Sequence, residues 1–187
     1  SFITSIGALG FFKYSDFFIS NVNSIFGSNL SLLGLALPIG ISFYTFQILS
    51  YTIDVYKGNV EPQHNYMKFF MYVSLYTQLV AGPIVRYADV ALEVNNRREN
   101  LEDIWSGTAR FLVGLTKKVF IANTAGQFAE TYLSGDLTTR STAAVWFGVL
   151  MFSIQIYYDF SGYSDMAIGL GKIFGFHFLE NFNYPYI

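Results

Sequence analysis

The sequence predicts an all-α fold, a polytopic transmembrane bundle of about five to six hydrophobic helices that forms part of a larger multi-pass protein. Hydrophobic residues make up 52% of the chain and charged residues only 13%, whereas a soluble domain carries about 25% charged residues. The apolar residues are also gathered into blocks, since residues 17–53 and 69–85 contain no Asp, Glu, Lys or Arg. A membrane-spanning helix needs roughly 20 mostly apolar residues, so several of these blocks are long enough.

The first predicted helix carries Lys13 and Asp16, so we expect a short span with a polar end or a helix partly at the membrane interface. In the second, Pro38 and Gly40 interrupt the apolar pattern. Proline removes a backbone donor, and the freed groups then need protein partners in a bilayer, so this segment is expected to be kinked or to turn back. The predicted hydrophobic segments, with a further helix in last place, are residues 1–27, 30–56, 66–84, 104–125, 142–160 and 161–175.

Residues 87–103 are the most polar stretch and are expected to form a solvated loop or an interfacial helix. The hydrophobic segment that follows them carries Arg110 and Lys117, seven residues apart. Seven residues are about two helical turns, so both cations lie on one face. Gly107 and Gly114 lie on a neighbouring face with the same spacing. This helix is therefore predicted to be amphipathic or to lie at the membrane boundary.

Charge and cysteine content exclude several classes of protein. The formal net charge is −2 and there is no cysteine. The charge argues against nucleic acid as a partner, and the predicted partner is the lipid bilayer. Without cysteine there is no disulfide framework, thiolate metal site or cysteine nucleophile, and we find no metal-ligand spacing. The chain starts with Ser and has no basic stretch ahead of a short apolar one, so we expect an internal piece of a larger protein.

Two aspartates follow the uncharged run of residues 141–158. Asp159 and Asp165 are six residues apart, which is about 120° around a helix, so they do not share a face as an acid–base couple would. The structural interpretation is that each aspartate caps a helix or pairs with a buried cation such as Arg110 or Lys117. The functional interpretation is that both line a polar cavity, because ionisable residues within membranes commonly serve function. The sequence leaves both open.

Small and amide residues accompany these aspartates. Ala167, Gly171 and Gly175 repeat every four residues, a spacing that lets another helix approach closely. Gln155 lies in the uncharged run, and similar glutamines occur in other apolar segments. A buried amide needs hydrogen-bond partners, so Gln155 is expected to bond between helices or to line a watery path.

Four stretches together carry a family resemblance: "LPIGISFYTFQILSYTIDVYKG", "QLVAGPIVRYADV", "RFLVGLTKKVFIAN" and "IQIYYDFSGYSDMAIGLGKIFGFHFLENFNYPYI". In this order they resemble the membrane-bound O-acyltransferase family. The resemblance is narrowest to its alginate O-acetyltransferase branch, with the D-alanyl transfer proteins of teichoic acid synthesis as near relatives. It covers nearly the whole chain from about residue 35, so residues 1–187 are interpreted as one incomplete domain of that family.

The resemblance implies a multi-helix bundle with a tunnel, placed as a multi-pass protein in the bacterial inner membrane. It implies an acyl donor such as acetyl-CoA, with no cofactor bound, an exported polysaccharide acceptor such as alginate, and periplasmic polysaccharide-modifying partner proteins. It also implies residues that line the tunnel or organise the site. These candidates are Gln155, Asp159, Ser161, Ser164, Asp165, Arg86, Asn181 and Asn183.

No catalytic residue is carried over to this chain. The histidine of the family lies in a Trp- and Arg-rich motif that is expected beyond Ile187, and neither His64 nor His177 matches it. Acyl transfer needs a general base, usually histidine, so residues 1–187 alone are expected to be inactive. Two alternatives stay open: a D-alanyl transfer protein for teichoic acids, and a membrane transporter or scaffold component without chemistry of its own.

Overall fold

The computed structural model describes residues 2–75 and 85–182. The described residues form helices and no strand, which confirms the all-α class. Among them, one helix, Thr142–Ile173, is long and apolar enough to cross a membrane by length and composition. The number of spans and the multi-pass bundle therefore stay predictions.

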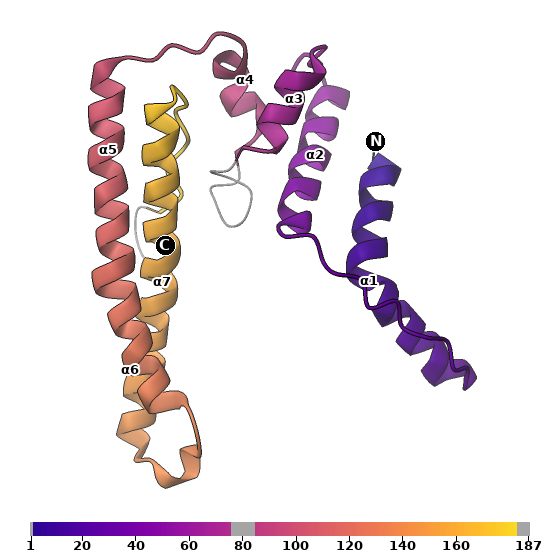
Figure 1. The fold of residues 1–187 in the computed structure, drawn as a ribbon, viewed down its shortest axis with the longest axis vertical. Coiled ribbons are helices and arrows are strands. Elements are labelled where there is room, and N and C mark those ends of the chain that lie inside the picture. Colours follow the sequence, from indigo (N-terminus) through magenta and orange to yellow (C-terminus); the bar gives the residue numbers. More distant parts are fainter. Residues whose placement is uncertain (1, 76–84, 183–187) are drawn as a thin grey trace. The chain divides into compact units, whose positions relative to one another are not determined.

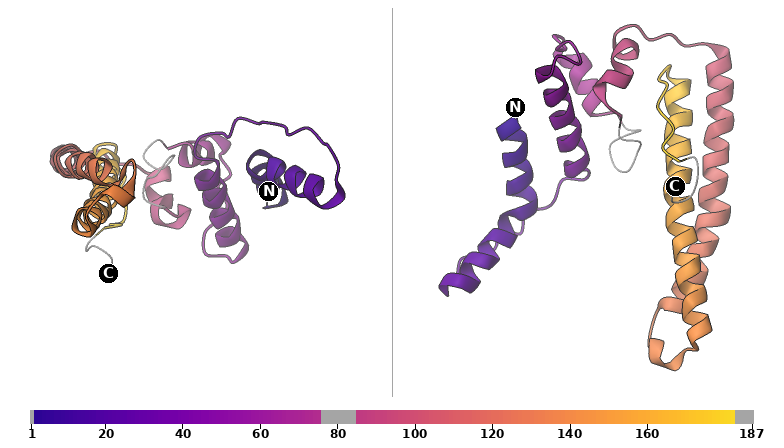
Figure 2. Two further views of the ribbon diagram at one scale, coloured as in Figure 1. Left: turned by 90° about the horizontal axis from the view of Figure 1, so that it is seen from below. Right: turned by 180° about the vertical axis from the view of Figure 1, so that it is seen from behind.

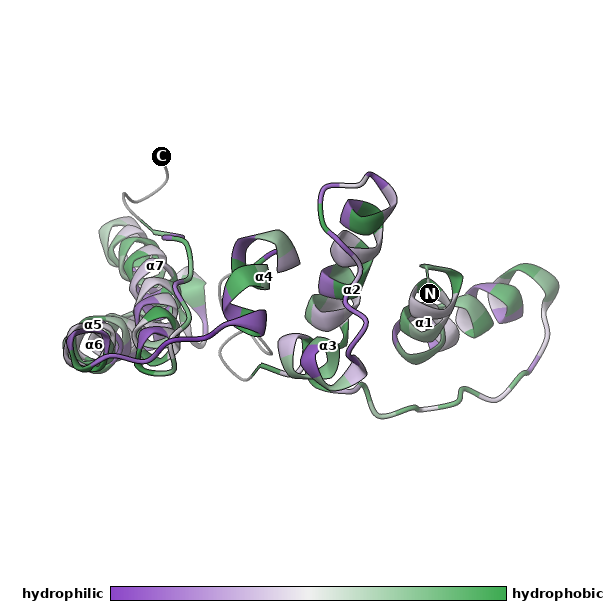
Figure 3. Ribbon diagram, turned by 90° about the horizontal axis from the view of Figure 1, so that it is seen from above, coloured by the Kyte–Doolittle hydropathy of each residue, from purple (hydrophilic) through white to green (hydrophobic). Residues whose placement is uncertain are grey.

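The chain divides into two compact units. The first comprises residues 1–80 and 84–91, and the second comprises residues 81–83 and 92–187. The helices of the first unit are α1 (Phe2–Phe26), α2 (Ile41–Tyr56), α3 (Tyr66–Val73) and the start of α4 (Tyr87–Asn95) (Figure 1). Hydrophobic residues predominate along α1 (Figure 3), and many of its aromatic side chains are exposed.

The predicted segment 30–56 is helical only over α2, so its boundary is corrected. Residues 27–40 form no helix, and Gly27, Gly34 and Gly40 in this stretch have φ angles of 61°, 57° and 75°. These are left-handed conformations that glycine adopts easily and that end a right-handed helix. Asp16 of α1 holds the stretch, because its carboxylate accepts hydrogen bonds from the backbone N–H groups of residues 33 and 34 at 2.8 and 3.1 Å.

The predicted segment 66–84 begins correctly at α3, whose N-terminus is capped by Asn65. The Asn65 side chain accepts hydrogen bonds from the next turn at 2.9 and 3.3 Å, which satisfies otherwise orphaned donors. The helix ends at Val73, and residues 76–84 lie outside the described residues. Three tyrosines build the core of this unit: the ring of Tyr87 lies 5.0 Å from that of Tyr51 and 5.1 Å from that of Tyr72.

The second unit is built around two long antiparallel helices (Figures 1 and 2). One runs without interruption through α5 (Leu101–Thr116), the π-helical turn η1 (Lys117–Ala122) and α6 (Asn123–Leu133). The other is α7 (Thr142–Ile173), which packs against α5, η1 and α6. The short 3₁₀ turn η2 (Leu137–Thr139) connects α6 to α7 in the chain. The predicted segment 104–125 was thus too short, because the first of these two helices begins at Leu101 and ends at Leu133.

The separation of residues 142–160 from a further helix at 161–175 was wrong, because α7 is continuous. Ser161 and Gly162, which lie at the predicted division, are weak helix formers. Both residues are buried, and the packing that buries them outweighs their low intrinsic propensity. The helix starts after the N-cap Ser141, whose hydroxyl accepts a hydrogen bond from Ala144 at 3.3 Å.

After α7 the chain reverses and follows the helix back; residues 174–182 are called the return segment (Figure 1). Gly175 makes the reversal with φ 74°, and the N–H of Phe176 donates to the carbonyl of Gly171 at 2.8 Å. Further along, the ring of Phe182 lies 5.1 Å from that of Phe160. The return segment therefore covers about three turns of α7.

Candidate functional site

Glycines bring α5 and α7 into backbone contact. A Cβ atom built on Gly107 would lie 2.5 Å from the carbonyl oxygen of Gly169, and one on Gly114 would lie 2.5 Å from that of Gly162. Real Cβ contacts are never this short, so these positions admit only glycine at the present helix separation. The two pairs are seven residues apart on each helix, which is about two turns. The two glycine pairs are called the seam, because along them the backbones of α5 and α7 are in direct contact.

The prediction that the small-residue stripe of α7 packs against another helix was wrong. Gly171 lies against the ring of Phe178, and Gly175 lies against the backbone of Arg98. The stripe therefore accommodates the return segment and the loop before α5. The helix–helix contact uses Gly162 and Gly169, on a different face of α7.

Asp165 lies in this seam and is 8% exposed. Its Oδ1 accepts hydrogen bonds from Nε and Nη2 of Arg110 at 3.1 and 2.7 Å, and its Oδ2 accepts one from Nζ of Lys117 at 2.5 Å. A buried carboxylate is costly unless it is paired and hydrogen-bonded. The structural interpretation of Asp165 as the partner of Arg110 or Lys117 is confirmed, with both cations bound at once.

Arg110 also binds the return segment. Its Nη1 and Nη2 donate to the two carboxylate oxygens of Glu180, while Nε and Nη2 face Asp165. The group of Arg110, Lys117, Asp165 and Glu180, called the ionic network, holds two positive and two negative charges. It is therefore neutral, which reduces the cost of placing it between helices.

The π-helical turn brings two neighbouring lysines to α7. Lys117 binds Asp165, and Lys118 forms an ion pair with Asp159. Successive residues of an α-helix are 100° apart, and a wider π turn reduces that angle, so adjacent side chains reach the same neighbour more easily. Asp159 thus has a cation of its own, as its separation from Asp165 around the helix indicated.

The two serine candidates are both buried in α7. Ser161, 1% exposed, accepts a hydrogen bond from Nζ of Lys117 at 3.2 Å and so extends the ionic network. Ser164 is 2% exposed, and its hydroxyl has no hydrogen-bond partner among the described residues. One turn apart, Ser164 and Ile168 lie on the face of α7 that also carries Gly171 and that the return segment approaches.

Gln155 and Asp159 line two separate hollows on the helix pair. Gln155 borders an open groove of about 610 Å³ between α6 and α7, whose polar lining includes Asn123, Gln127 and Glu130. Gly126 makes room for it, because a Cβ there would lie 2.8 Å from the Gln155 amide nitrogen. Asp159 borders a second hollow of about 320 Å³ with Tyr163. The structure thus places both candidates on cavities.

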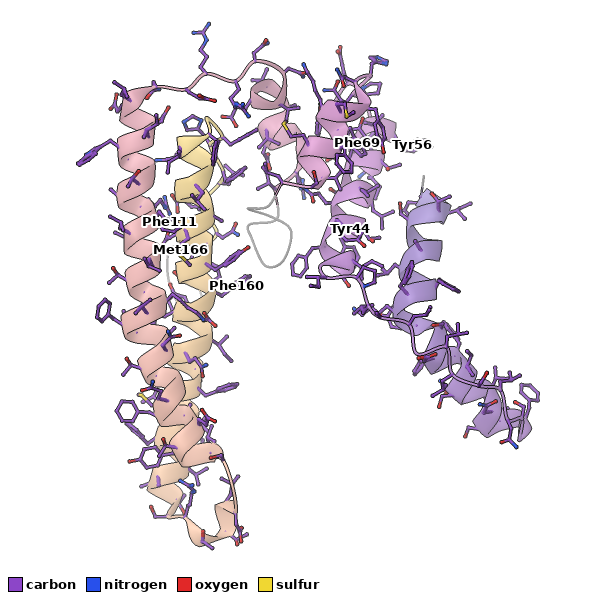
Figure 4. All side chains as sticks on the ribbon, in the orientation of Figure 1. Tyr44, Tyr56, Phe69, Phe111, Phe160 and Met166 are labelled. Carbon is purple, nitrogen blue, oxygen red and sulfur yellow. The ribbon has the colours of Figure 1, made fainter. Side chains whose placement is uncertain are left out.

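The remaining candidates lie outside this cluster or outside the description. Arg86 belongs to the first unit, where it is exposed and its backbone N–H donates to Asp89 at 3.3 Å. Asn181 is exposed in the return segment, next to Glu180. Asn183 lies outside the described residues. Figure 4 shows Phe160 projecting from α7, whereas Phe111 and Met166 lie where α5 meets α7.

Sequence reasoning missed Glu180, and it named His177 only as a residue that does not match the family histidine. The backbone N–H of His177 donates to Glu93 at 3.0 Å, its Nδ1 lies 2.8 Å from the other oxygen of Glu93, and its Nε2 lies 3.4 Å from Asp103. The hydrogen bond to Glu93 raises the pKa of His177, and the charge of Asp103 adds to this. The signal for Glu180 was its position after a helix-ending glycine, where a chain can turn back.

The chemistry open to the ionic network is limited because the carboxylate of Asp165 is fully hydrogen-bonded. Both oxygens of Asp165 already accept hydrogen bonds from cations, so the carboxylate is poorly placed to take a proton from a substrate. It can hold α5, α7 and the return segment in one arrangement. The described residues contain no group of three or more side chains able to hold a metal ion.

The helix pair and its ionic network fall within one family match. Residues 60–186 match the membrane-bound O-acyltransferase family, which is more than half of the 187 residues. The chain belongs to this family. The resemblance drawn from the four motifs is thereby confirmed, and the membrane-bound character of the chain with it.

The names of the relatives that this chain resembles refer to different polymers. The chain is 43% identical to a probable alginate O-acetylase, AlgI, of Pseudomonas aeruginosa, over 99% of this chain and 36% of the relative. It is 36% identical to a peptidoglycan O-acetyltransferase of Helicobacter pylori, over 98% and 40%. It is 24% identical to a teichoic acid D-alanyltransferase of Bacillus subtilis, over 80% and 38%. The chain thus spans 36% to 40% of the length of these relatives.

Proposed function

We propose that this chain is part of an O-acetyltransferase that passes acetyl groups across the bacterial inner membrane toward hydroxyls of an exported polysaccharide such as alginate. The observation that carries the proposal is the 43% identity to a probable alginate O-acetylase over 99% of the chain. The match spans both the seam and the ionic network. D-alanyl transfer is the weaker candidate, since the identity to the D-alanyltransferase is 24%.

In this proposal the described residues organise the site and the general base comes from elsewhere in the protein. Acyl transfer to a hydroxyl needs a base whose pKa lies near the operating pH, usually histidine. His64 is exposed in the loop before α3, and His177 is bound by two carboxylates. Neither histidine is placed as such a base. The family resemblance implies a histidine beyond Ile187, acetyl-CoA as donor and periplasmic proteins as partners, and we propose these for the full-length protein.

The polar positions of α7 then form one wall of the acyl path. Gln155 and Asp159 border hollows, while Asp165 and Ser161 are tied to the opposite helix. Water-lined paths through membrane proteins are built from such polar groups on packed helices. A multi-pass bundle around α7 would enclose this wall from the lipid side.

The test is deletion of the full-length gene in the bacterium that carries it, followed by complementation. Ester-bound acetyl and D-alanyl groups on the exported polymers would be measured in parallel. We expect loss of acetyl esters that the wild-type gene restores. Loss of D-alanyl esters alone would favour the D-alanyltransferase alternative, and unchanged esters of both kinds would favour a transporter or scaffold.

A further inference from the structure

The contact between Arg110 and Glu180 joins a helix to a segment without regular structure. Each terminal nitrogen of the guanidinium faces its own oxygen of Glu180. A planar guanidinium fixes a carboxylate in two dimensions when it binds both oxygens, which gives geometric specificity as well as energy. The pair therefore determines where Glu180 lies along α5, and not only that it lies nearby.

Asp165 does not need Glu180 for its own charge to be paired. Asp165 already has two cations, Arg110 and Lys117, and is the more buried carboxylate: its side chain is 11% exposed, against 56% for Glu180. An exposed ion pair contributes little to stability. The main effect of Glu180 must then be on the location of its own segment.

Besides Glu180, the return segment makes two kinds of contact. Near its start, His177 bonds to Glu93 and Asp103. Beyond His177, its contacts with α7 are apolar. Phe178 packs on Gly171, and the ring of Phe182 lies 5.8 Å from Tyr157 and 5.1 Å from Phe160. Apolar contacts are non-directional, so they tolerate sliding along the helix. Glu180 lies between Phe178 and Phe182 and supplies the directional contact for the part of the segment that follows His177.

We propose that Arg110 and Glu180 are positioning residues for acyl transfer. Their ion pair fixes the return segment against α5, and so holds Asn181 and Phe182 beside the polar half of α7. The inference rests on the function proposed above. Neither residue acts on the acyl group itself in this proposal.

The experiment compares variants of the full-length protein in bilayer nanodiscs. Glu180→Gln removes the negative charge at nearly constant shape, and Glu180→Asp keeps that charge on a shorter side chain. Arg110→Lys keeps the positive charge but removes the guanidinium that binds both oxygens of Glu180. Glu102→Gln is the matched control, since Glu102 is exposed on the first turn of α5 and lies outside the ionic network. Hydrogen exchange of residues 174–182 and steady-state acetyl transfer are measured for each.

We expect Glu180→Gln and Arg110→Lys to speed exchange in the return segment and to lower kcat about tenfold, which corresponds to about 1.4 kcal/mol of transition-state stabilisation. For Glu180→Gln, KM for the acyl donor and the amount of folded protein should stay unchanged, because Asp165 keeps both of its cations. Glu180→Asp should recover part of both losses, and Glu102→Gln should change neither.

Two results would overturn the proposal. Unchanged exchange in residues 174–182 of Glu180→Gln would show that the ion pair does not fix the segment. Faster exchange with wild-type kcat would show that the location of the segment is irrelevant to transfer. Absence of transfer by the wild-type protein would instead refute the proposed function, and the exchange comparison would still test the anchor.

Discussion

Lys117 and Asp165 are 48 residues apart in the chain, and their Nζ and Oδ2 atoms meet at 2.5 Å between two helices packed through glycine. The lysine comes from a π-helical turn and the aspartate from the middle of α7. A contact of this kind depends on the helix separation, because a wider gap would leave the carboxylate paired less closely. Packing and charge are thus coupled in this helix pair.

The first prediction concerns Asp165→Asn. The substitution leaves Arg110 and Lys117 facing a neutral amide, and breaking a buried ion pair costs about 3–5 kcal/mol. We expect less folded protein in the membrane and reduced acetyl transfer. Asp159→Asn is the matched control, because its ion pair with Lys118 is 43% and 39% exposed at the side chains and should cost at most about 1 kcal/mol. Equal losses for both variants, measured by thermal unfolding, would contradict this ranking.

A second prediction concerns Gly114→Ala. The added Cβ would lie 2.5 Å from the carbonyl oxygen of Gly162, so the helices must separate. Overpacking of this kind costs about 1–3 kcal/mol, and it should lower the unfolding temperature of the full-length protein. Gly10→Ala in α1 is the control. Among the described residues, nothing outside its own stretch of helix lies within 4 Å of the added Cβ, and alanine favours helix. A Gly114→Ala protein as stable as wild type would refute the seam.

A third prediction concerns pH. Glu93 and Asp103 raise the pKa of His177 above its ordinary value of 6.5. A raised pKa in the folded state means that protonation favours folding, so this contribution is fully present below pH 6.5 and is lost as pH rises through the folded-state pKa. His177→Gln should therefore reduce the unfolding temperature at about pH 5 more than at about pH 8. The opposite slope in thermal unfolding would show that His177 is neutral when bound.

The fourth prediction separates the groove from the fold. Gln155 borders the open groove between α6 and α7, so Gln155→Leu should leave the amount of folded protein unchanged while it lowers acetyl transfer. The reason is that the groove would lose an amide that can solvate a polar group in transit. Phe152→Leu, an apolar change in the same lining, is the control. Wild-type transfer by Gln155→Leu would remove this groove from the acyl path.

Some of this arrangement was predictable because it follows from spacing along one helix. Arg110 and Lys117 share a face by helical period alone, and their role as partners of Asp165 follows from the cost of an unpaired carboxylate in a buried seam. The family resemblance was predictable from motifs. These inferences need no knowledge of where distant segments lie.

Other features could not be predicted from hydropathy. An apolar run records burial or lipid contact and not backbone conformation, so residues 30–40 were predicted as part of a hydrophobic segment although Gly34 and Gly40 have left-handed φ angles. Conversely, the predicted division of α7 between residues 160 and 161 was wrong, because the sequence pattern does not show the tertiary packing that buries Ser161 and Gly162. The pairing of Glu180 with Arg110 spans 70 residues, a distance that no local pattern encodes.

The double glycine pair has a consequence for how the hairpin assembles. If α5 slid along α7 by seven residues, Gly107 could still face Gly162, but Gly114 would then meet Gln155, where no carbonyl-to-glycine fit exists. In that arrangement Asp165 would lose the cations that it binds at the native register. This misaligned hairpin would therefore lose the close helix packing and the charge pairing together, so both contributions favour the native register of α5 and α7.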